Sequence, residues 1–332
     1  MDIRFILYTC LLFILFSCDD KQTDVYQTRR DNVVNVKLEK LDFGDDILMG
    51  RGTRIYVLDD FLEFSDYSSS QKMIHLFDKN TLSYVASIGD LGQGPGEIIS
   101  LGQVMQNDKK DKLYVSDLGH LCIYSFDIDS LKRDKDYMPY IKYHMQPEMI
   151  PTYLTYVSDT LCFATYVQYI DNKTTRRVSG KWNMKTNEVK LMDYIQPDVK
   201  NYQTNYAYSK KHNLFVEAHG RADLISIFDS SFNLKHNVYG PDWDDGDDQK
   251  LNFFPTVICN GYIISAYSGS SYRDYMLPTK LLVFKMNGDY VKTLETGCKI
   301  HFMSADEDNE RLFLSLDEEF QFAYLDLKGI LN

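Results

Sequence analysis

The 332-residue chain lacks the short motifs by which most metal and catalytic sites are recognised. Its six cysteines form no Cys-x-x-Cys pair and no Cys/His spacing that would hold zinc. None of its seven histidines stands in a His-Glu-x-x-His or His-x-His pattern, and no Gly-x-Ser-x-Gly elbow occurs. No single stretch therefore holds a complete catalytic set, which leaves open a triad assembled from separate segments.

Clustered positive charge and long apolar runs are also missing. The net charge is −12, and no cluster of Lys or Arg is long enough to form a phosphate-binding stripe, so we expect no nucleic-acid partner. After the first 20 residues no apolar run is long enough to span a membrane. Aromatic residues are plentiful, with 25 Tyr and 19 Phe, and such side chains suit the half-buried surface of a β-sheet.

The N-terminus predicts a cleaved signal peptide and a lipid anchor. Phe5 to Phe16 is an apolar run too short to span a membrane, and a buried N-terminal helix is the alternative. The run leads into Leu-Phe-Ser-Cys, which resembles a lipobox that ends at Cys18, the residue that would carry the lipid. We therefore predict an outer-membrane lipoprotein, on a side of the membrane that the sequence leaves open. Its predicted parts are a signal peptide over 1–17, a flexible tether over 18–32 and a folded body over 33–332.

A strand-like segment that ends in a turn residue recurs at intervals of 41 to 56 residues. The six copies end at Asp78, Asp127, Asn183, Asp229, Lys285 and Asp326. Two shorter strand-like runs precede each copy, and a turn with a fourth run follows it. Asn260-Gly261 and Asn287-Gly288 are typical hairpin turns between such runs. Six units of four antiparallel strands predict an all-β fold, a six-bladed β-propeller.

The two ends of the chain predict how this ring closes. Only six residues follow Asp326, too few for a good fourth strand in the last blade. Val34, Val36 and Leu38 alternate with polar residues at period two. We expect the N-terminal strand from Val33 to Leu41 to complete the last blade, because a propeller leaves no open edge. An independent edge strand is the alternative.

One blade carries a family resemblance. Residues 88–97, Ile-Gly-Asp-Leu-Gly-Gln-Gly-Pro-Gly-Glu, and the later run 113–127 resemble one NHL repeat. With the lipobox, the chain resembles more closely the six-bladed, TolB-like propeller lipoproteins of gut Gram-negative bacteria, which carry the same Gly-x-Gly-Pro-Gly-Glu turn. The resemblance implies the fold and the anchor but brings neither a partner nor a site. Since no helix follows the glycine-rich turn, we interpret it as a link between blades rather than a phosphate loop.

The acidic run from Asp242 to Asp248 holds five carboxylates, which are ligands that Ca²⁺ prefers. Its Gly246 falls fifth rather than sixth in the run, and no helix flanks it. We therefore favour a solvated connector between blades. The sequence predicts no metal site and no cofactor, with Ca²⁺ as the alternative.

Two further features concern covalent chemistry. Cys122 and Cys162 fall inside apolar strand patterns and are predicted to be free thiols, although export permits a disulfide. The state of Cys259 and Cys298 is left open. Asp-Ser-Leu and Asp-Thr-Leu triplets around Ser130 and Thr160 resemble an O-glycosylation acceptor of gut Gram-negative bacteria. Both triplets are also ordinary turn sequences.

The strand order predicts which face binds a ligand. Turns between the second and third strands lie on the same face as the links between blades, because successive strands alternate in direction. Long loops at 59–72, 166–177 and 267–279 alternate with short ones, which predicts three walls above a shallow floor. The candidate ligand-binding residues are Tyr169, Arg176, Tyr272 and Arg273 on the walls, beside Arg177, and Asp117, His120, His219 and Arg221 on the floor. Long solvated loops without a binding role are the alternative.

These features favour a non-enzymatic binding module held at the envelope by its lipid anchor. The partner would be an envelope protein, a peptide or a glycan, and the anchor is the only predicted membrane contact. The alternative is a propeller hydrolase or lyase with a divalent metal such as Ca²⁺ in the central channel, as in the arylesterase-like and NHL-type lyase propellers.

The lipid anchor is directly testable. The substitution Cys18→Ala should release the protein from membranes, because the acylated cysteine is the only membrane attachment that the sequence predicts. Fractionation of the native host into soluble and membrane proteins measures this. A variant that stays with the membrane would point to an uncleaved leader or to a partner that holds the protein there.

Overall fold

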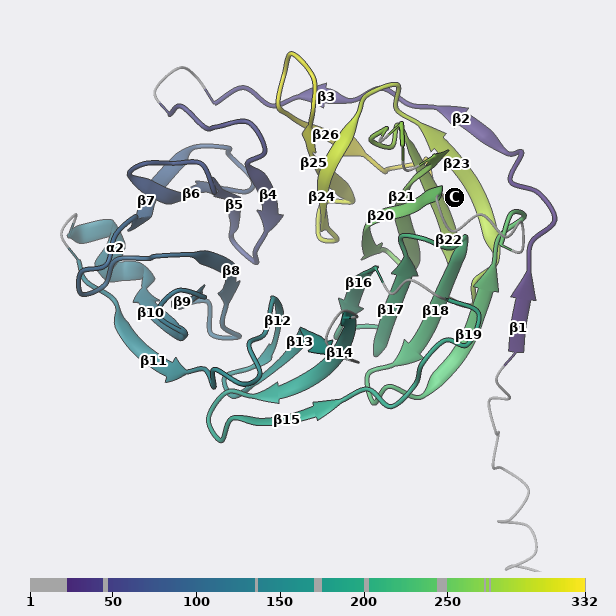
Figure 1. The fold of residues 1–332 in the computed structure, drawn as a ribbon. Coiled ribbons are helices and arrows are strands. Elements are labelled where there is room, and N and C mark those ends of the chain that lie inside the picture. Colours follow the sequence, from purple (N-terminus) through teal and green to yellow (C-terminus); the bar gives the residue numbers. More distant parts are fainter. Residues whose placement is uncertain are drawn as a thin grey trace, which may run out of the picture.

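The computed structural model describes residues 23–43, 47–134, 137–169, 175–199, 203–243, 250–271, 273–274 and 276–331, and at Tyr169 the backbone alone. Its strands form six sheets arranged as blades around a central axis (Figure 1). The predicted all-β, six-bladed propeller is confirmed. Within these residues no helix is both long enough and apolar enough to cross a membrane.

The first three blades each hold four antiparallel strands, numbered from the axis outward. Blade one contains β4 (Arg54–Val57), β5 (Phe61–Ser65), β6 (Lys72–Asp78) and β7 (Tyr84–Asp90). Blade two contains β8 (Leu101–Gln106), β9 (Lys112–Asp117), β10 (Cys122–Asp127) and β11 (Tyr140–His144), with the short helix α2 (Ile128–Arg133) after β10. Blade three contains β12 (Tyr153–Ser158), β13 (Leu161–Tyr169), β14 (Thr175–Asn183) and β15 (Glu188–Leu191).

The other three blades repeat the pattern and use the N-terminal segment in addition. Blade four contains β16 (Thr204–Ser209), β17 (Leu214–His219), β18 (Leu224–Asp229) and β19 (Leu234–Tyr239). Blade five contains β20 (Lys250–Cys259), β21 (Tyr262–Ser271), β22 (Lys280–Lys285) and β23 (Tyr290–Glu295). Blade six contains β24 (Ile300–Asp306), β25 (Arg311–Leu316), β26 (Phe322–Asp326) and β3 (Glu39–Lys40).

The third strand of every blade ends at the residue that the sequence repeat marked, from Asp78 in β6 to Asp326 in β26. The hairpin signals are confirmed as well. Asn260 and Gly261 have φ values of 50° and 81°, so both central residues of this turn lie in the left-handed region that a type I′ turn requires. The glycine-rich run around Gly94 connects blade one to blade two, as expected of a link between blades.

The prediction of a long loop at 59–72 is wrong. It contains a complete second strand, β5, and its Phe61 and Phe64 are buried in the core rather than raised as a wall. The strand-like run was missed because buried strands on both faces show no alternation of apolar and polar residues. Blades three and five do extend: β13 and β14 have 9 residues each, and β20 and β21 have 10 each.

The N-terminal segment, residues 23–41, wraps three blades, and we call it the strap. Its first strand, β1 (Thr23–Tyr26), pairs parallel with β19, and β2 (Val33–Asn35) pairs parallel with β23. Only β3 completes blade six, antiparallel to β26, and the backbone N–H of Leu41 donates to the carbonyl of Phe322 at 3.0 Å. The strap is visible along the outer edge in Figure 1.

The prediction that an N-terminal strand completes blade six is therefore confirmed. The predicted length of that strand is wrong. The predicted closing strand from Val33 to Leu41 serves two blades, because its first residues pair with blade five and only its last ones with blade six. Between them Val36 and Leu38 pack against the core that these two blades share. Residues 23–32, assigned to a flexible tether, lie along the propeller from Thr23 onward.

Arg30 binds the strap to the boundary between blades four and five. Its Nη1 lies 2.7 Å from Asp223 Oδ1, and the two side chains are only 8% and 1% exposed. The guanidinium also lies over the rings of Phe253, Tyr267 and Phe284, at 5.4 to 5.8 Å from their centroids. Burial raises the pKa of Asp223, and Arg30 opposes that rise.

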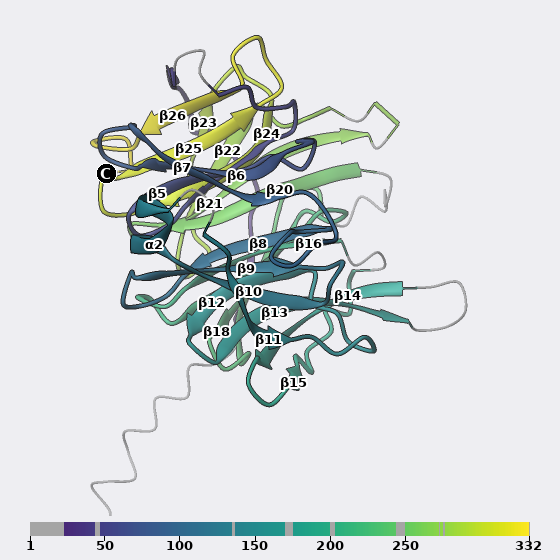
Figure 2. The same ribbon diagram turned by 90° about the vertical axis from the view of Figure 1, so that its left-hand side faces the viewer.

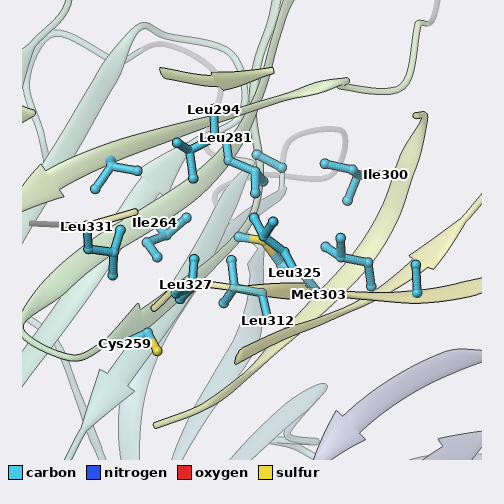
Figure 3. Close-up of a cluster of buried hydrophobic side chains, with 14 of the residues drawn as sticks. Cys259, Ile264, Leu281, Leu294, Ile300, Met303, Leu312, Leu325, Leu327 and Leu331 are labelled. Carbon is cyan, nitrogen blue, oxygen red and sulfur yellow. The ribbon is translucent and has the colours of Figure 1, made fainter. Parts of the chain in front are cut away.

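The core lies between the blades, in layers of apolar side chains from facing sheets. Figure 3 shows the layer between blades five and six, where Ile264, Leu281 and Leu294 meet Leu312 and Leu325. Cys259 belongs to the same layer and is a free thiol. Cys122 and Cys162 are buried and free, as predicted, and Cys298 is half-buried and free. Packing of this kind fixes the spacing of the inner strands, and so the width of the centre.

The strap is predicted to stabilise the whole domain. A chain that begins at Asp42 should lose more than about 3 kcal/mol of unfolding free energy, since Asp223 alone would become a buried charge without its partner and blade six would lose its outer strand. Chemical denaturation measures this. A chain that begins at Thr23 keeps the strap and is the control, and equal stability of the two chains would contradict the prediction.

Candidate functional site

The first strands of all six blades surround a cavity of about 280 Å³ at the centre of the ring. Its walls are Arg54 and Tyr56 of β4, Gln103 of β8, Tyr153 to Thr155 of β12, Thr204 to Tyr206 of β16, Phe254 to Thr256 of β20 and His301 to Met303 of β24, with Arg177 from β14. The cavity is a little below the usual size range of small-molecule sites. Since every blade contributes to it, residues far apart in the sequence meet there.

The cavity opens on the face that carries the links between blades and the turns between second and third strands. We call it the loop face. Arg54, Tyr153, Thr204 and His301 stand at or near the beginnings of their first strands, which start on this face. Figure 2 shows the loop face on the right, where β13 and β14 reach outward, and α2 on the left. The predicted face is thus the one where the central cavity opens.

Two arginines give the cavity its positive charge. Arg54 Cζ lies 5.3 Å from the ring centroid of Tyr67 and 5.5 Å from that of Phe302. Arg177 Cζ lies 5.9 Å from the ring centroid of Tyr153. Within the described part of the chain neither arginine forms an ion pair, and no carboxylate lines the cavity. Positive charge between low-dielectric walls attracts an anion into such a concavity.

Aromatic rings form much of the remaining wall and are held in place. The Tyr56 ring lies 4.7 Å from that of Phe302, and Gln103 Nε2 donates to Tyr56 Oη at 3.5 Å. On the other side Thr155 Oγ1 donates to Tyr206 Oη at 3.3 Å. Burial raises the pKa of Tyr56 and of Tyr206, so both phenols stay neutral. Fixed ring faces beside cations suit a ligand that combines a planar or ring-shaped part with an anionic group.

His301 provides a hydrogen-bonding group at the edge of the cavity. Burial and the charge of Arg54 lower the pKa of His301 from its ordinary value, while Asp317 opposes this, so the imidazole is neutral at pH 7. Its Nδ1 is buried and has no hydrogen-bond partner among the described residues. Buried polar atoms are normally paired, so His301 is an exception at the edge of the cavity.

Two buried glutamates stand directly behind the tyrosines of the wall. Glu63 of β5 pairs with Tyr56 and is fully buried, and its Oε1 accepts from Ser65 Oγ at 2.6 Å. Burial raises the pKa of Glu63 to about 8. Glu217 of β17 pairs with Tyr206, its Oε1 accepts from Ser179 Oγ at 2.5 Å, and burial raises its pKa to about 7. Both carboxyl groups are therefore largely protonated in mildly acidic solution.

Two of the predicted floor residues hold a link between blades. Asp117 is fully buried and accepts hydrogen bonds from the backbone N–H groups of Ile99, Ser100 and Gly119. Burial raises the pKa of Asp117, but these hydrogen bonds outweigh it and the net shift is downward. His120 Nδ1 lies 2.6 Å from Asp117 Oδ2. The carboxylate thus organises the backbone where blade one passes into blade two.

Apart from Arg177, the other predicted residues that the structure describes do not line the cavity. His219 is buried at the end of β17, its Nε2 lies 3.3 Å from Ser226 Oγ, and burial lowers its pKa to about 3. Arg221 Nε donates to Gln203 Oε1, and Arg176 Nε donates to Gln168 Oε1. Arg273 is exposed. Cys18, Tyr272, the side chain of Tyr169 and residues 244–248 of the acidic run fall outside the described residues.

The candidate modification sites differ in local structure. Thr160 lies in the turn between β12 and β13, as predicted, whereas Ser130 lies within α2 rather than in a turn. The reason is that Asp127 caps this helix by accepting from the Ser130 backbone N–H at 2.8 Å. Both residues are half-buried. Among the described residues no three His, Cys, Asp or Glu side chains form a group suited to a metal ion.

Arg54 and His301 were absent from the candidates drawn from the sequence. Each belongs to the innermost strand of a blade, and neither has a local motif. The sequence repeat could have located them, because the blade boundaries indicate where every first strand begins. A larger groove of about 680 Å³ lies between β7 and the segment around Tyr137 to Pro139, but only blades one and two line it. The central cavity is the site where all six blades converge.

Comparison with known proteins supports the fold. No family model matches the chain, and no curated protein is similar to it in sequence. A member of the DUF4221 family from Bacteroides vulgatus superposes with a TM-score of 0.61 at 12% identity, over 89% of this chain and 98% of that one. A protein of Bacteroides fragilis described as exported superposes with 0.52 at 12% identity, over 86% and 88% of the two chains.

A third solved structure, regucalcin from Agrobacterium tumefaciens, is described as a calcium-binding protein. It superposes with a TM-score of 0.55 at 9% identity and covers 89% of this chain and 95% of that one. At this level of identity the likeness extends to the propeller architecture alone.

The buried Glu63 should make the stability of the domain depend on pH. The unfolded carboxyl loses its proton near its ordinary pKa of 4.5, whereas the folded one keeps it up to a pKa of about 8. Stability therefore falls as the pH rises between these two values, by on the order of 4 kcal/mol. Glu63→Gln cannot ionise, so its stability should fall less between pH 5 and pH 9.

Urea denaturation across this pH range measures the effect. Glu188→Gln, at an exposed position of β15, is the matched control and should follow the unchanged protein. If Glu63→Gln shows the same loss of stability from pH 5 to pH 9 as the control, the side chain is already ionised in the folded protein.

Proposed function

We propose that this protein is a non-enzymatic binding module of the cell envelope whose central cavity takes a small organic anion with a ring-shaped part. The observation that carries the proposal is the pair Arg54 and Arg177, two cations without an ion-pair partner in the described part of the chain. They stand beside the rings of Tyr153 and Phe302 in one concavity. A carboxylate on the ligand would receive charge-assisted hydrogen bonds from the guanidinium groups, and its ring would lie against the aromatic walls.

The envelope location has separate support. The leader resembles that of a lipoprotein with Cys18 as the lipidated residue, and a structural neighbour from Bacteroides fragilis is described as exported. The strap adds a geometric argument. Because β1 runs parallel to β19, Thr23 lies toward the face opposite the loop face. A lipid at Cys18 would then hold the propeller by that opposite face and leave the cavity mouth directed away from the membrane.

A hydrolase or lyase with a divalent ion in the channel is the less supported function. Solved propellers with this architecture include regucalcin, described as calcium-binding. In this chain two guanidinium groups line the central cavity and repel a divalent cation. The polar walls contributed by Gln103, Thr155 and Asn205 suit hydrogen bonding to a ligand equally well without a metal.

Binding of simple carboxylates tests the proposal. We expect N-acetyltyrosine or galacturonate to bind, and their neutral counterparts, N-acetyltyrosinamide and galactose, to bind more weakly. Isothermal titration calorimetry measures the four affinities. Arg54→Gln and Arg177→Gln should each lower the affinity for the acid by roughly 10-fold to 100-fold, the usual loss for one charge-assisted hydrogen bond.

Arg176→Gln is the matched control. It removes the same charge one residue away on β14, where the side chain bonds to Gln168 and does not line the cavity. Acids that bind this variant and the two cavity variants equally well, or bind no better than their neutral counterparts, would refute an anion site in the centre.

A further inference from the structure

A second cavity of about 320 Å³ adjoins the central one on the loop face. It lies where blade six meets the segment before β4 and the β21–β22 turn. Its walls include Arg51, Leu277, His301, Asp317, Glu318 and Gln321. His301 also lines the central cavity, so the two spaces share one wall. A molecule longer than the central cavity would therefore meet the second one beside His301.

The shared wall can bind such a molecule. The imidazole of His301 lies between the positive charge of Arg54, which lowers its pKa, and the negative charge of Asp317, which raises it. Its Nδ1 is buried without a hydrogen-bond partner among the described residues. A neutral imidazole accepts or donates a hydrogen bond, according to its tautomer, where the ligand passes.

The two cavities differ in charge. Arg54 and Arg177 make the central cavity positive, whereas the second cavity holds two carboxylates, Asp317 and Glu318, against the single cation Arg51. Asp317 is exposed and forms no ion pair within the described part of the chain. Glu318 Oε1 accepts from the backbone N–H of Lys299 at 2.9 Å, which fixes the position of its carboxylate.

From this arrangement we infer that the ligand is bipolar: a short peptide whose terminal carboxylate occupies the central cavity and whose basic group reaches the second cavity. The inference rests on the proposed function, since it uses the same anion site. A peptide carries opposite charges several bonds apart, as the two cavities require. A chain of uronic acids carries a carboxylate on every unit, and its next carboxylate would meet Asp317 and Glu318.

The test uses synthetic peptides with a C-terminal Tyr and zero to two Ala residues before it. Each peptide begins with Lys or Glu, whose α-amino group is acetylated and whose side chain stays charged. We expect the best Lys peptide to bind about fivefold to tenfold more tightly than the matching Glu peptide, as two weakly screened charges would give. Its C-terminal amide should bind weakly, because the carboxylate that faces Arg54 is lost. Tri-galacturonate is the glycan probe and should bind less tightly than the Lys peptide.

Protein variants assign the preference to the second cavity. In the double variant Asp317→Asn, Glu318→Gln the ratio between Lys and Glu peptides should fall to about one. Glu319→Gln is the matched control, since Glu319 is the next residue and does not line the cavity. Thermal melting of each variant verifies that it is folded.

Two results would overturn the inference. One is that Lys and Glu peptides bind with equal affinity and that this affinity still depends on Arg54. The anion site would then be retained, and the second cavity would have no part in binding. The other is tighter binding of tri-galacturonate that improves further in the Asp317, Glu318 variant, which identifies an anionic glycan. If no acid depends on Arg54, the proposed function fails together with the inference.

Discussion

Closure of the ring by the pairing of β3 with β26 is the constraint on which the other features depend. The inner strands carry the cavity, and their distance from the axis is set by six blades packed side by side without a gap. An open edge at blade six would leave backbone N–H and C=O groups of β26 unpaired and the layer around Leu312 and Leu325 exposed on one side. The short β3, only two residues long, is supported by the rest of the strap and above all by the buried pair of Arg30 and Asp223.

The cavity combines features that oppose stability. The buried nitrogen of His301 and the buried carboxyl groups of Glu63 and Glu217 cost free energy in a folded chain. Buried side-chain atoms without a hydrogen-bond partner among the described residues also occur away from the cavity, at His75 and Ser125 for example. Asp117 shows the opposite case, because its carboxylate accepts hydrogen bonds from the link that it organises.

The fold was largely predictable from the sequence, whereas the central cavity was not. The third strands could be located because each one combines a buried apolar run with a turn residue that stops it, such as Asp127 at the end of β10. The signal is local, and it repeats. The second strand of blade one was missed because β5 is buried on both faces. The strap was placed only in part because its partners lie more than two hundred residues away, and alternation of Val34, Val36 and Leu38 does not specify which edge they meet.

For the site the difficulty is one of distance in the sequence. The predicted residues were chosen from loops that look suited to binding, and the structure brings Arg177 from that set to the cavity. Arg54 and His301 stand almost 250 residues apart and become neighbours only because blades one and six are adjacent in the closed ring. Asp117 and His219 were chosen for their chemistry, and both are buried, Asp117 beside the link between blades one and two and His219 at the end of β17.

The direction of β1 also determines how the domain carries mechanical load. Four residues of β1 pair with β19 in parallel, from Thr23 with His236 to Tyr26 with Tyr239. Tension applied at the N-terminal end acts along this strand, so its hydrogen bonds share the force in shear instead of parting one after another as in an unzipping hairpin. Beyond them the Arg30–Asp223 pair resists the same pull before any force reaches β3. The pairing of β3 with β26 that closes the ring is therefore shielded from a force applied at the N-terminal end.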